Sequence, residues 1–176
     1  MSSLQDLQTR YTQLNDDFNV LTSKHKPATP EQIHAFEHSV NLRLSDDVKE
    51  FLTGLGQLII DVKENVWARP KEMEVLPMWK FGYGFYVFGL SQEPGVPEWM
   101  TFDYYFDEEE TPAKGQQFFQ RSGNAYRAYI LDGKITIEYD HYGEDTEPFK
   151  GNLFDFLIAE IEKLEMDYKR YIAGEE

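Results

Sequence analysis

The spacing of apolar residues changes twice along this chain of 176 residues, from a helical pattern to an extended one and back. Apolar residues recur every three or four positions over residues 4–21, which predicts a first helix ending near Thr22. Aromatic segments broken by Gly and Pro, among them residues 85–90 and 99–106, predict strands up to about residue 142. The helical spacing returns from Asn152 to about Ala173. Helices, then strands, then a closing helix predict an α+β domain instead of alternating βαβ units.

Two further helices are predicted before the strands. Thr29, Pro30 and Gln32 supply an N-cap, a proline at the first helical position and the glutamine of a capping box. Ser45 begins the next helix, and the two aspartates that follow it suit the positive end of a helix dipole. Gly56 permits the turn out of that helix.

The clearest strand signal is a hairpin with Asp132-Gly133 as its two-residue turn, of type I′. Four cross-strand pairs follow from this turn, three on a dry face and one ionic pair on a wet face: Ile130 with Ile135, Ala128 with Ile137, Tyr126 with Tyr139, and Arg127 with Glu138. We therefore predict a central, largely antiparallel sheet with the C-terminal helix packed on it.

Charge and cysteine content exclude several classes of function. The formal net charge of −15 should repel nucleic acid and anionic membrane surfaces and favour cationic partners. The absence of cysteine excludes disulfides, thiolate zinc sites and a cysteine nucleophile. The N-terminal sequence lacks the basic and apolar regions of a signal peptide, and no apolar run is long enough to span a membrane. We expect a cytoplasmic protein.

Motifs for catalysis or cofactor binding are weak. His34 and His38 have a spacing that could serve one metal ion, but no third ligand is evident. Gly82, Gly84 and Gly89 precede a strand and lack the Lys-Ser/Thr of a phosphate loop. We expect a protein that is not an enzyme and that needs no cofactor or metal.

Two acidic segments interleaved with aromatic residues are the candidate partner-binding residues. Neither contains Lys or Arg, and together they supply Asp103, Asp107, Glu108, Glu109, Glu110, Glu138, Asp140, Tyr142, Glu144 and Asp145. Carboxylates beside aromatic rings suit an interface that contacts Lys and Arg by ion pairs and cation–π stacking. The alternative is a solvated loop whose aromatic residues belong to the core.

The N-terminal motifs resemble the opening of the SUKH superfamily. They are Pro30-Glu31-Gln32-Ile33 with Phe36-Glu37, then Leu44-Ser45-Asp46-Asp47 and Phe51-Leu52 before a glycine. The run Asn152-Leu153-Phe154-Asp155-Phe156-Leu157 is similar to the terminal helix of that family. Ser45 replaces the usual proline, and Leu55-Gly56 stands where Asn-Gly is common. The resemblance implies one SUKH-like domain over residues 1–176, with a core at about 29–164 and an extra N-terminal helix at 1–24.

The family includes a yeast regulator of cell-wall glucan synthesis, the bacterial Syd protein and many bacterial immunity proteins. The resemblance therefore implies a protein-binding module, and the acidity favours an immunity protein that occludes a basic toxin domain such as a nuclease. One alternative is a scaffold or regulator with a cellular partner. The other is a small-ligand binder or enzyme that uses the aromatic region from Trp67 to Trp99.

Overall fold

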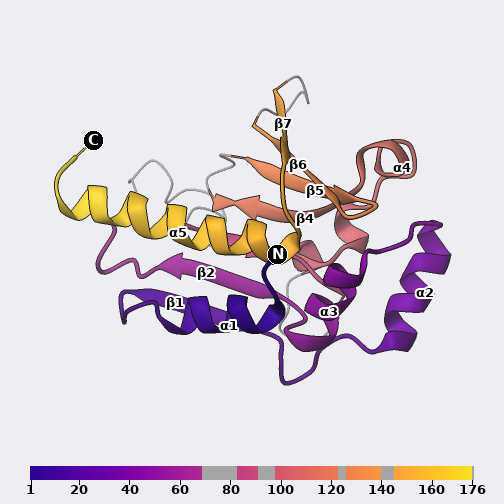
Figure 1. Cartoon of the computed structure of the whole chain (residues 1–176), viewed down its shortest axis with the longest axis horizontal. Helices are drawn as coiled ribbons and strands as arrows, with labels where there is room; N and C mark the ends of the chain where they lie inside the picture. Colours follow the sequence, from indigo (N-terminus) through magenta and orange to yellow (C-terminus); the bar gives the residue numbers. More distant parts are fainter. Residues whose placement is uncertain (69–82, 91–97, 123–125, 140–144, 176) are drawn as a thin grey trace.

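Seven strands form one antiparallel sheet in which the spatial order, β1 to β7, is the order along the chain (Figure 1). The computed structural model describes residues 1–68, 83–90, 98–122, 126–139 and 145–175. The strands are β1 (Phe18–Thr22), β2 (Leu58–Val62), β3 (Gly84–Val87), β4 (Gln116–Arg121), β5 (Arg127–Leu131), β6 (Lys134–Glu138) and β7 (Thr146–Phe149). The predicted α+β class and antiparallel sheet are confirmed.

Helices precede, interrupt and follow the sheet. They are α1 (Leu4–Thr12), α2 (Pro30–Val40), α3 (Asp46–Gly54), the short α4 (Thr111–Lys114) and the long α5 (Leu153–Ile172), with 3-10 turns η3 (Glu98–Met100) and η4 (Asp103–Tyr105). Helix α5 lies across the sheet and α1 lies beside it (Figure 1). No helix in the described part of the chain combines the length and apolarity needed to cross a membrane.

Capping boxes mark where three of the helices begin, and the one at α1 is formed by Ser3 and Asp6. Thr29 and Gln32 form the predicted capping box at the start of α2. Asn152 and Asp155 form another one at the start of α5, with each side chain accepting a hydrogen bond from the other residue's amide. At the start of α3 the Ser45 hydroxyl donates a hydrogen bond to the Asp47 carboxylate, and it accepts none from the helix amides.

The predicted first helix is shorter than its apolar stripe, and this part of the prediction was wrong. Helix α1 ends at Thr12, and Phe18 already begins β1. Between them the Asn15 side chain accepts a hydrogen bond from the Asp17 amide, and this turn reverses the chain. The strand is stabilised by pairing along its whole length with β2, a long-range interaction that apolar spacing does not encode.

The core between α5 and the sheet is built from aromatic rings. Phe156 of α5 meets the rings of Phe118, Phe119 and Phe149 edge-on, with centroid distances of 5.5, 4.9 and 5.3 Å. Phe156 is fully buried. Edge-to-face contacts of this kind add to the stabilisation that burial provides, so α5 is held to the middle of the sheet.

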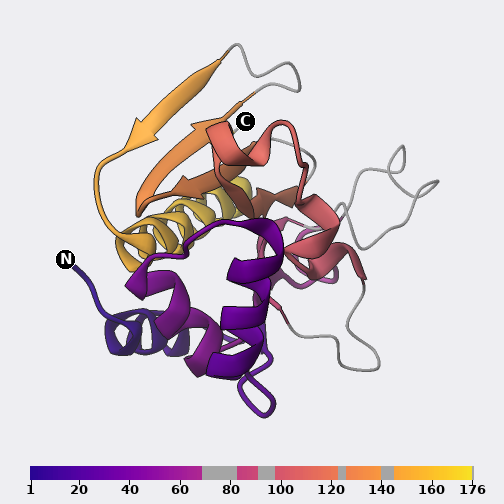
Figure 2. The same ribbon diagram turned by 90° about the vertical axis from the view of Figure 1, so that its right-hand side faces the viewer.

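The opposite face of the sheet is covered by the segment from η3 to α4. Phe88 stacks on Tyr105 at 4.4 Å, and Tyr86 meets Trp99 edge-on at 5.2 Å. This segment was predicted as a strand over residues 99–106, but η3 and η4 occupy most of it, joined by the bridge residue Thr101 and by Phe102. Figure 2 shows α4 and α5 on different sides of β5 and β6.

The hairpin has the predicted turn and register. Asp132 and Gly133 have φ of 50° and 74°, the two positive values that a type I′ turn requires. Three of the four predicted pairs are in the ladder, and the fourth, Tyr126 with Tyr139, lies beyond it with the two rings 5.5 Å apart. Past this hairpin β7 forms one edge of the sheet, with Pro148 opposite Thr136.

Candidate functional site

The first predicted acidic segment is exposed where η4 leads into α4. All of its carboxylates are exposed: Asp103, Asp107, Glu108, Glu109 and Glu110. Within the described residues, no ion pair engages any of them. The segment therefore presents concentrated negative charge that is available to a partner. We call these five residues and Tyr104 the acidic surface.

Tyr104 adds an aromatic ring to the acidic surface, and the neighbouring Tyr105 holds this part of the chain in place. The Tyr104 side chain is 54 % exposed and meets the Tyr105 ring edge-on at 5.0 Å. Tyr105 stacks on Phe88, and burial raises the pKa of Tyr105 to about 12, so this phenol stays neutral. One ring is thus fixed in the protein while the other is displayed to solvent.

Asp107 holds the turn that carries the glutamates. Its Oδ1 atom accepts hydrogen bonds from the amides of Glu110 and Glu109, each at 2.8 Å, and these bonds lower the pKa of Asp107. Its own amide donates to Oγ1 of Thr111 at 2.8 Å. Local hydrogen bonds therefore hold the turn that carries the three glutamates, and their side chains are exposed.

Glu138, a predicted contact residue, is buried. Its side chain is 1 % exposed, forms an ion pair with Arg127 Nε at 3.0 Å, and accepts a hydrogen bond from the Tyr129 hydroxyl at 3.4 Å. Lys114 of α4 pairs with its other oxygen and lies 4.4 Å from the centre of the Tyr129 ring. The face predicted to be wet is covered by α4, so Glu138 fastens α4 to the sheet and presents no charge to solvent.

The second acidic segment is only partly described. Asp145 is exposed, and its carbonyl accepts a hydrogen bond from the Tyr139 amide at 2.9 Å. Asp140, Tyr142 and Glu144 lie outside the described residues. Thr146 pairs with Glu138, so Asp145 lies beside the end of β6.

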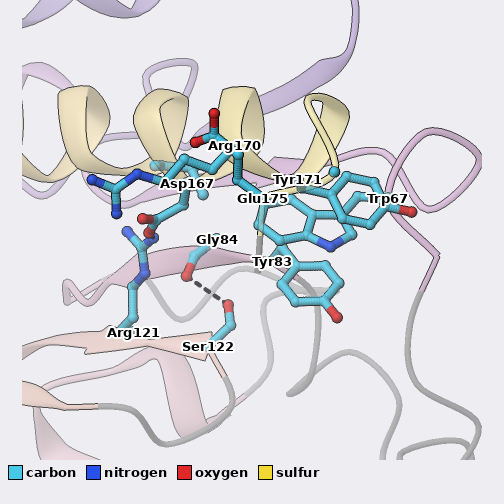
Figure 3. A pocket seen from close by; sticks show the side chains of 11 residues that line it. Trp67, Tyr83, Gly84, Arg121, Ser122, Asp167, Arg170, Tyr171 and Glu175 are labelled. Carbon is cyan, nitrogen blue, oxygen red and sulfur yellow. Dashed lines mark hydrogen bonds and ion pairs between the residues drawn. The ribbon is translucent and has the colours of Figure 1, made fainter.

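A pocket of about 770 Å³ lies at the C-terminal end of α5, near the ends of β3 and β4 (Figure 3). Its residues come from four parts of the described chain: Trp67, Tyr83, Gly84, Arg121, Ser122, Leu164, Asp167, Arg170, Tyr171, Gly174 and Glu175. The volume is typical of small-molecule sites. The pocket contains the first part of the aromatic region that the sequence offered as a ligand site.

One wall of the pocket is a stack of three aromatic rings. The Trp67 indole lies between Tyr83, at 3.9 Å and 10° from parallel, and Tyr171, at 4.8 Å and 14°. Figure 3 shows this stack on one side of the pocket. The three rings come from the chain after β2, the chain before β3 and the end of α5, so stacking joins three distant segments.

The opposite wall is built around Arg121. Its Nη2 atom lies 2.9 Å from Asp167 Oδ2, and its Nη1 atom lies 3.5 Å from Glu160 Oε2. The Tyr126 hydroxyl donates to the same Glu160 oxygen and accepts a hydrogen bond from Lys163 Nζ at 3.1 Å. This network fixes the arginine between two carboxylates of α5.

Burial gives Glu160 an unusual proton affinity. Desolvation raises the pKa of Glu160 above its ordinary 4.5, although the hydrogen bond from Tyr126 and the charge of Arg121 oppose the change. The pKa of Tyr126 is also raised, by burial and by the Glu160 charge, so the phenol remains a donor. The folded protein therefore binds the Glu160 proton more tightly than the unfolded chain does.

A pH prediction follows from Glu160. Lowering the pH from 7 toward 4.5 protonates this carboxyl in the folded protein before the unfolded chain, so Glu160 makes a contribution to stability that rises on acidification. The free energy of unfolding of the wild type should rise relative to that of Glu160→Gln over this interval. Urea unfolding at a series of pH values measures the difference. The exposed Glu162→Gln on the same helix is the control, and an equal pH trend in all three proteins would contradict the assignment.

The structure offers no metal site at the predicted histidines. His34 and His38 are both exposed on α2. Across the part of the chain that the structure describes, no three His, Asp or Glu residues are placed to hold a metal ion. The spacing on α2 thus brings no third ligand from another described element.

Sequence reasoning missed the carboxylate of α5 that holds Arg121 of the pocket. A usable signal was present, because Glu160 lies three residues after Leu157 and four before Leu164, on the apolar stripe of α5. A carboxylate at such a position requires a buried partner. The partner itself, Arg121, could be identified only from the packing of β4 against α5.

We compared the chain with known proteins: no protein-family model matches it, and no curated protein or solved structure is significantly similar to it.

Proposed function

We propose that this protein is a binding module for another protein and that the acidic surface contacts a positively charged domain. The supporting observation is a set of five exposed carboxylates, none of which forms an ion pair with another described residue, in the same segment as the half-exposed ring of Tyr104. Lys and Arg side chains can pair with such carboxylates and stack on such a ring. The net charge of −15 would steer a basic partner toward the protein from a distance.

The surface also has a rigid support. Lys114 and Arg127 converge on the buried Glu138 carboxylate, which ties α4 to β5 and β6. Tyr105 is fixed on Phe88 of the segment after β3. A surface held in this way loses little conformational entropy when a partner binds, so a larger share of the contact energy contributes to affinity.

An immunity protein that occludes a toxin domain is the leading form of this proposal. The resemblance of residues 29–164 to the SUKH superfamily supports that class, and a basic nuclease would have the complementary charge. A scaffold or regulator with a cellular partner would use the same surface. The two forms differ in the partner, which for an immunity protein is encoded beside this gene.

The test reverses the charge of Glu108, Glu109 and Glu110 to lysine. Association with the toxin domain encoded by the neighbouring gene should slow by about 10-fold or more at low salt, because steering by exposed charges is long-ranged. The difference in association rate between wild type and variant should shrink above physiological ionic strength, because exposed charges are already screened beyond about 8 Å at that ionic strength. Stopped-flow association across a salt series gives the rate, and coexpression with the toxin gives rescue of growth.

The matched control is the triple reversal Glu50→Lys, Glu64→Lys and Glu162→Lys. These three glutamates are exposed on other parts of the chain, so the variant has the same net charge without altering the acidic surface. It should associate faster than the Glu108–Glu110 variant. Equal rates for the two variants would show that only net charge matters, and failure of the wild type to bind or rescue would remove the immunity proposal.

A further inference from the structure

The pocket at the C-terminal end of α5 combines an aromatic wall with fixed polar groups. The stack of Tyr83, Trp67 and Tyr171 faces a wall made by Arg121 and Asp167 (Figure 3). Leu164 adds an apolar contact. A ligand that fits both walls needs a flat apolar body and a rim that makes hydrogen bonds.

The polar groups of the pocket include donors and acceptors. Arg121 is held by two carboxylates, and its guanidinium is an array of N–H donors of which only some are used by them. Asp167 supplies carboxylate acceptors and is partly exposed. The Ser122 hydroxyl donates to the Gly84 carbonyl at 2.7 Å, and a hydroxyl oxygen that donates can still accept a hydrogen bond.

The charges of the residues that line the pocket indicate whether its ligand is ionic or neutral. Among the lining residues that the structure describes, the cations Arg121 and Arg170 are balanced by the anions Asp167 and Glu175. The chain as a whole is strongly acidic, so an anion would be repelled at long range. A cation would find no surplus carboxylate in this described part of the lining. An uncharged ligand suits this balance best.

The geometry points to a binding site for a planar, uncharged heteroaromatic group that has hydrogen-bond donors and acceptors on its rim, the chemistry of a nucleobase in a nucleoside. Stacked aromatic residues are the common contact for the ring of such a group, and Arg and Asp pair with its edge. This site is independent of the acidic surface, because α4 and the C-terminal end of α5 lie at opposite ends of the molecule (Figure 1).

The test is an NMR titration of the ¹⁵N-labelled full chain with adenosine, inosine and cytidine. At least one nucleoside should shift the Trp67 indole N–H and the amides of Gly84 and Ser122, with a Kd of about 1 mM or lower. Adenosine monophosphate should bind several-fold more weakly than adenosine, because its phosphate adds negative charge. Indole, which has the ring without the matching rim, should also bind more weakly than the best nucleoside.

Variants separate the walls of the site. Trp67→Phe keeps an aromatic ring but reduces the stack, and Asp167→Asn removes the charge while keeping the shape. Each should weaken nucleoside binding about 5-fold or more, whereas Tyr104→Ala on the acidic surface should have no effect.

Three outcomes would overturn the inference. They are the absence of shifts around the pocket with every nucleoside, tighter binding of the monophosphate, and binding of indole equal to that of the best nucleoside. None of these measurements involves a protein partner, so a negative result for nucleoside binding would not bear on the proposed protein-binding function.

Discussion

Phe156→Ala is expected to lower the free energy of unfolding by about 3–5 kcal/mol, the usual cost of truncating a buried phenylalanine. Phe156 is 1 % exposed, and three rings surround it edge-on, from both Phe118 and Phe119 of β4 and from Phe149 of β7. Alanine would leave a cavity bounded by α5 and two strands that are not adjacent in the sheet. The neighbouring elements cannot close it without separating from one another.

Urea unfolding followed by circular dichroism measures this change. Ile172→Ala is a suitable control on the same helix, because Ile172 is 62 % exposed and its truncation should change the free energy of unfolding by less than about 0.5 kcal/mol. A loss below about 1 kcal/mol for Phe156→Ala would show that α5 contributes little to holding the sheet together.

Gly115→Ala is the second large effect, with an expected loss of about 2–4 kcal/mol. Gly115 joins α4 to β4 with φ of 98° and ψ of 173°, a conformation that is essentially restricted to glycine. A Cβ atom there would also lie 2.5 Å from the carbonyl oxygen of Ile130. Because that oxygen belongs to a central strand, it cannot move aside without breaking the pairing of β4 with β5.

Gly133→Ala provides the comparison, since Gly133 also has a positive φ, of 74°, but an added Cβ atom would make only an ordinary van der Waals contact there, 3.6 Å from Cβ of Ser45. We expect a loss of about 1 kcal/mol from the left-handed backbone alone. Thermal and urea unfolding of both variants test the pair. If the two substitutions lower the free energy of unfolding equally, the steric contact at Gly115 does not contribute to the loss. That result would mean that α4 can shift relative to the sheet.

Local chemistry predicted the parts of the fold that depend on neighbouring residues. The Asp132-Gly133 turn determined the register of the hairpin because a two-residue turn leaves only one way to count outward. The capping box at Thr29 determined the start of α2 in the same way. Each of these signals is complete within a few residues of sequence.

The sequence-based predictions were wrong where contacts with a distant segment determine the local structure. Residues 99–106 have the aromatic content of a strand, but only Thr101 forms a bridge, with Gly89, and η3 and η4 lie on either side of it. Glu138 was placed on a wet face because nothing near it in sequence reveals that Lys114 of α4 would cover it. Part of the second acidic segment, residues 140–144, lies beyond the described chain, so its contribution to binding stays a prediction.

The proline in β7 has a consequence for behaviour at high concentration. An outer strand of an open sheet offers unpaired amides and carbonyls, to which the same strand of another molecule can add. Pro148 has no N–H to offer, and Glu147 beside it would bring like charges together when two such strands approach. Strand β7 is also short, so self-assembly through this edge of the sheet is disfavoured even though the strand is largely exposed.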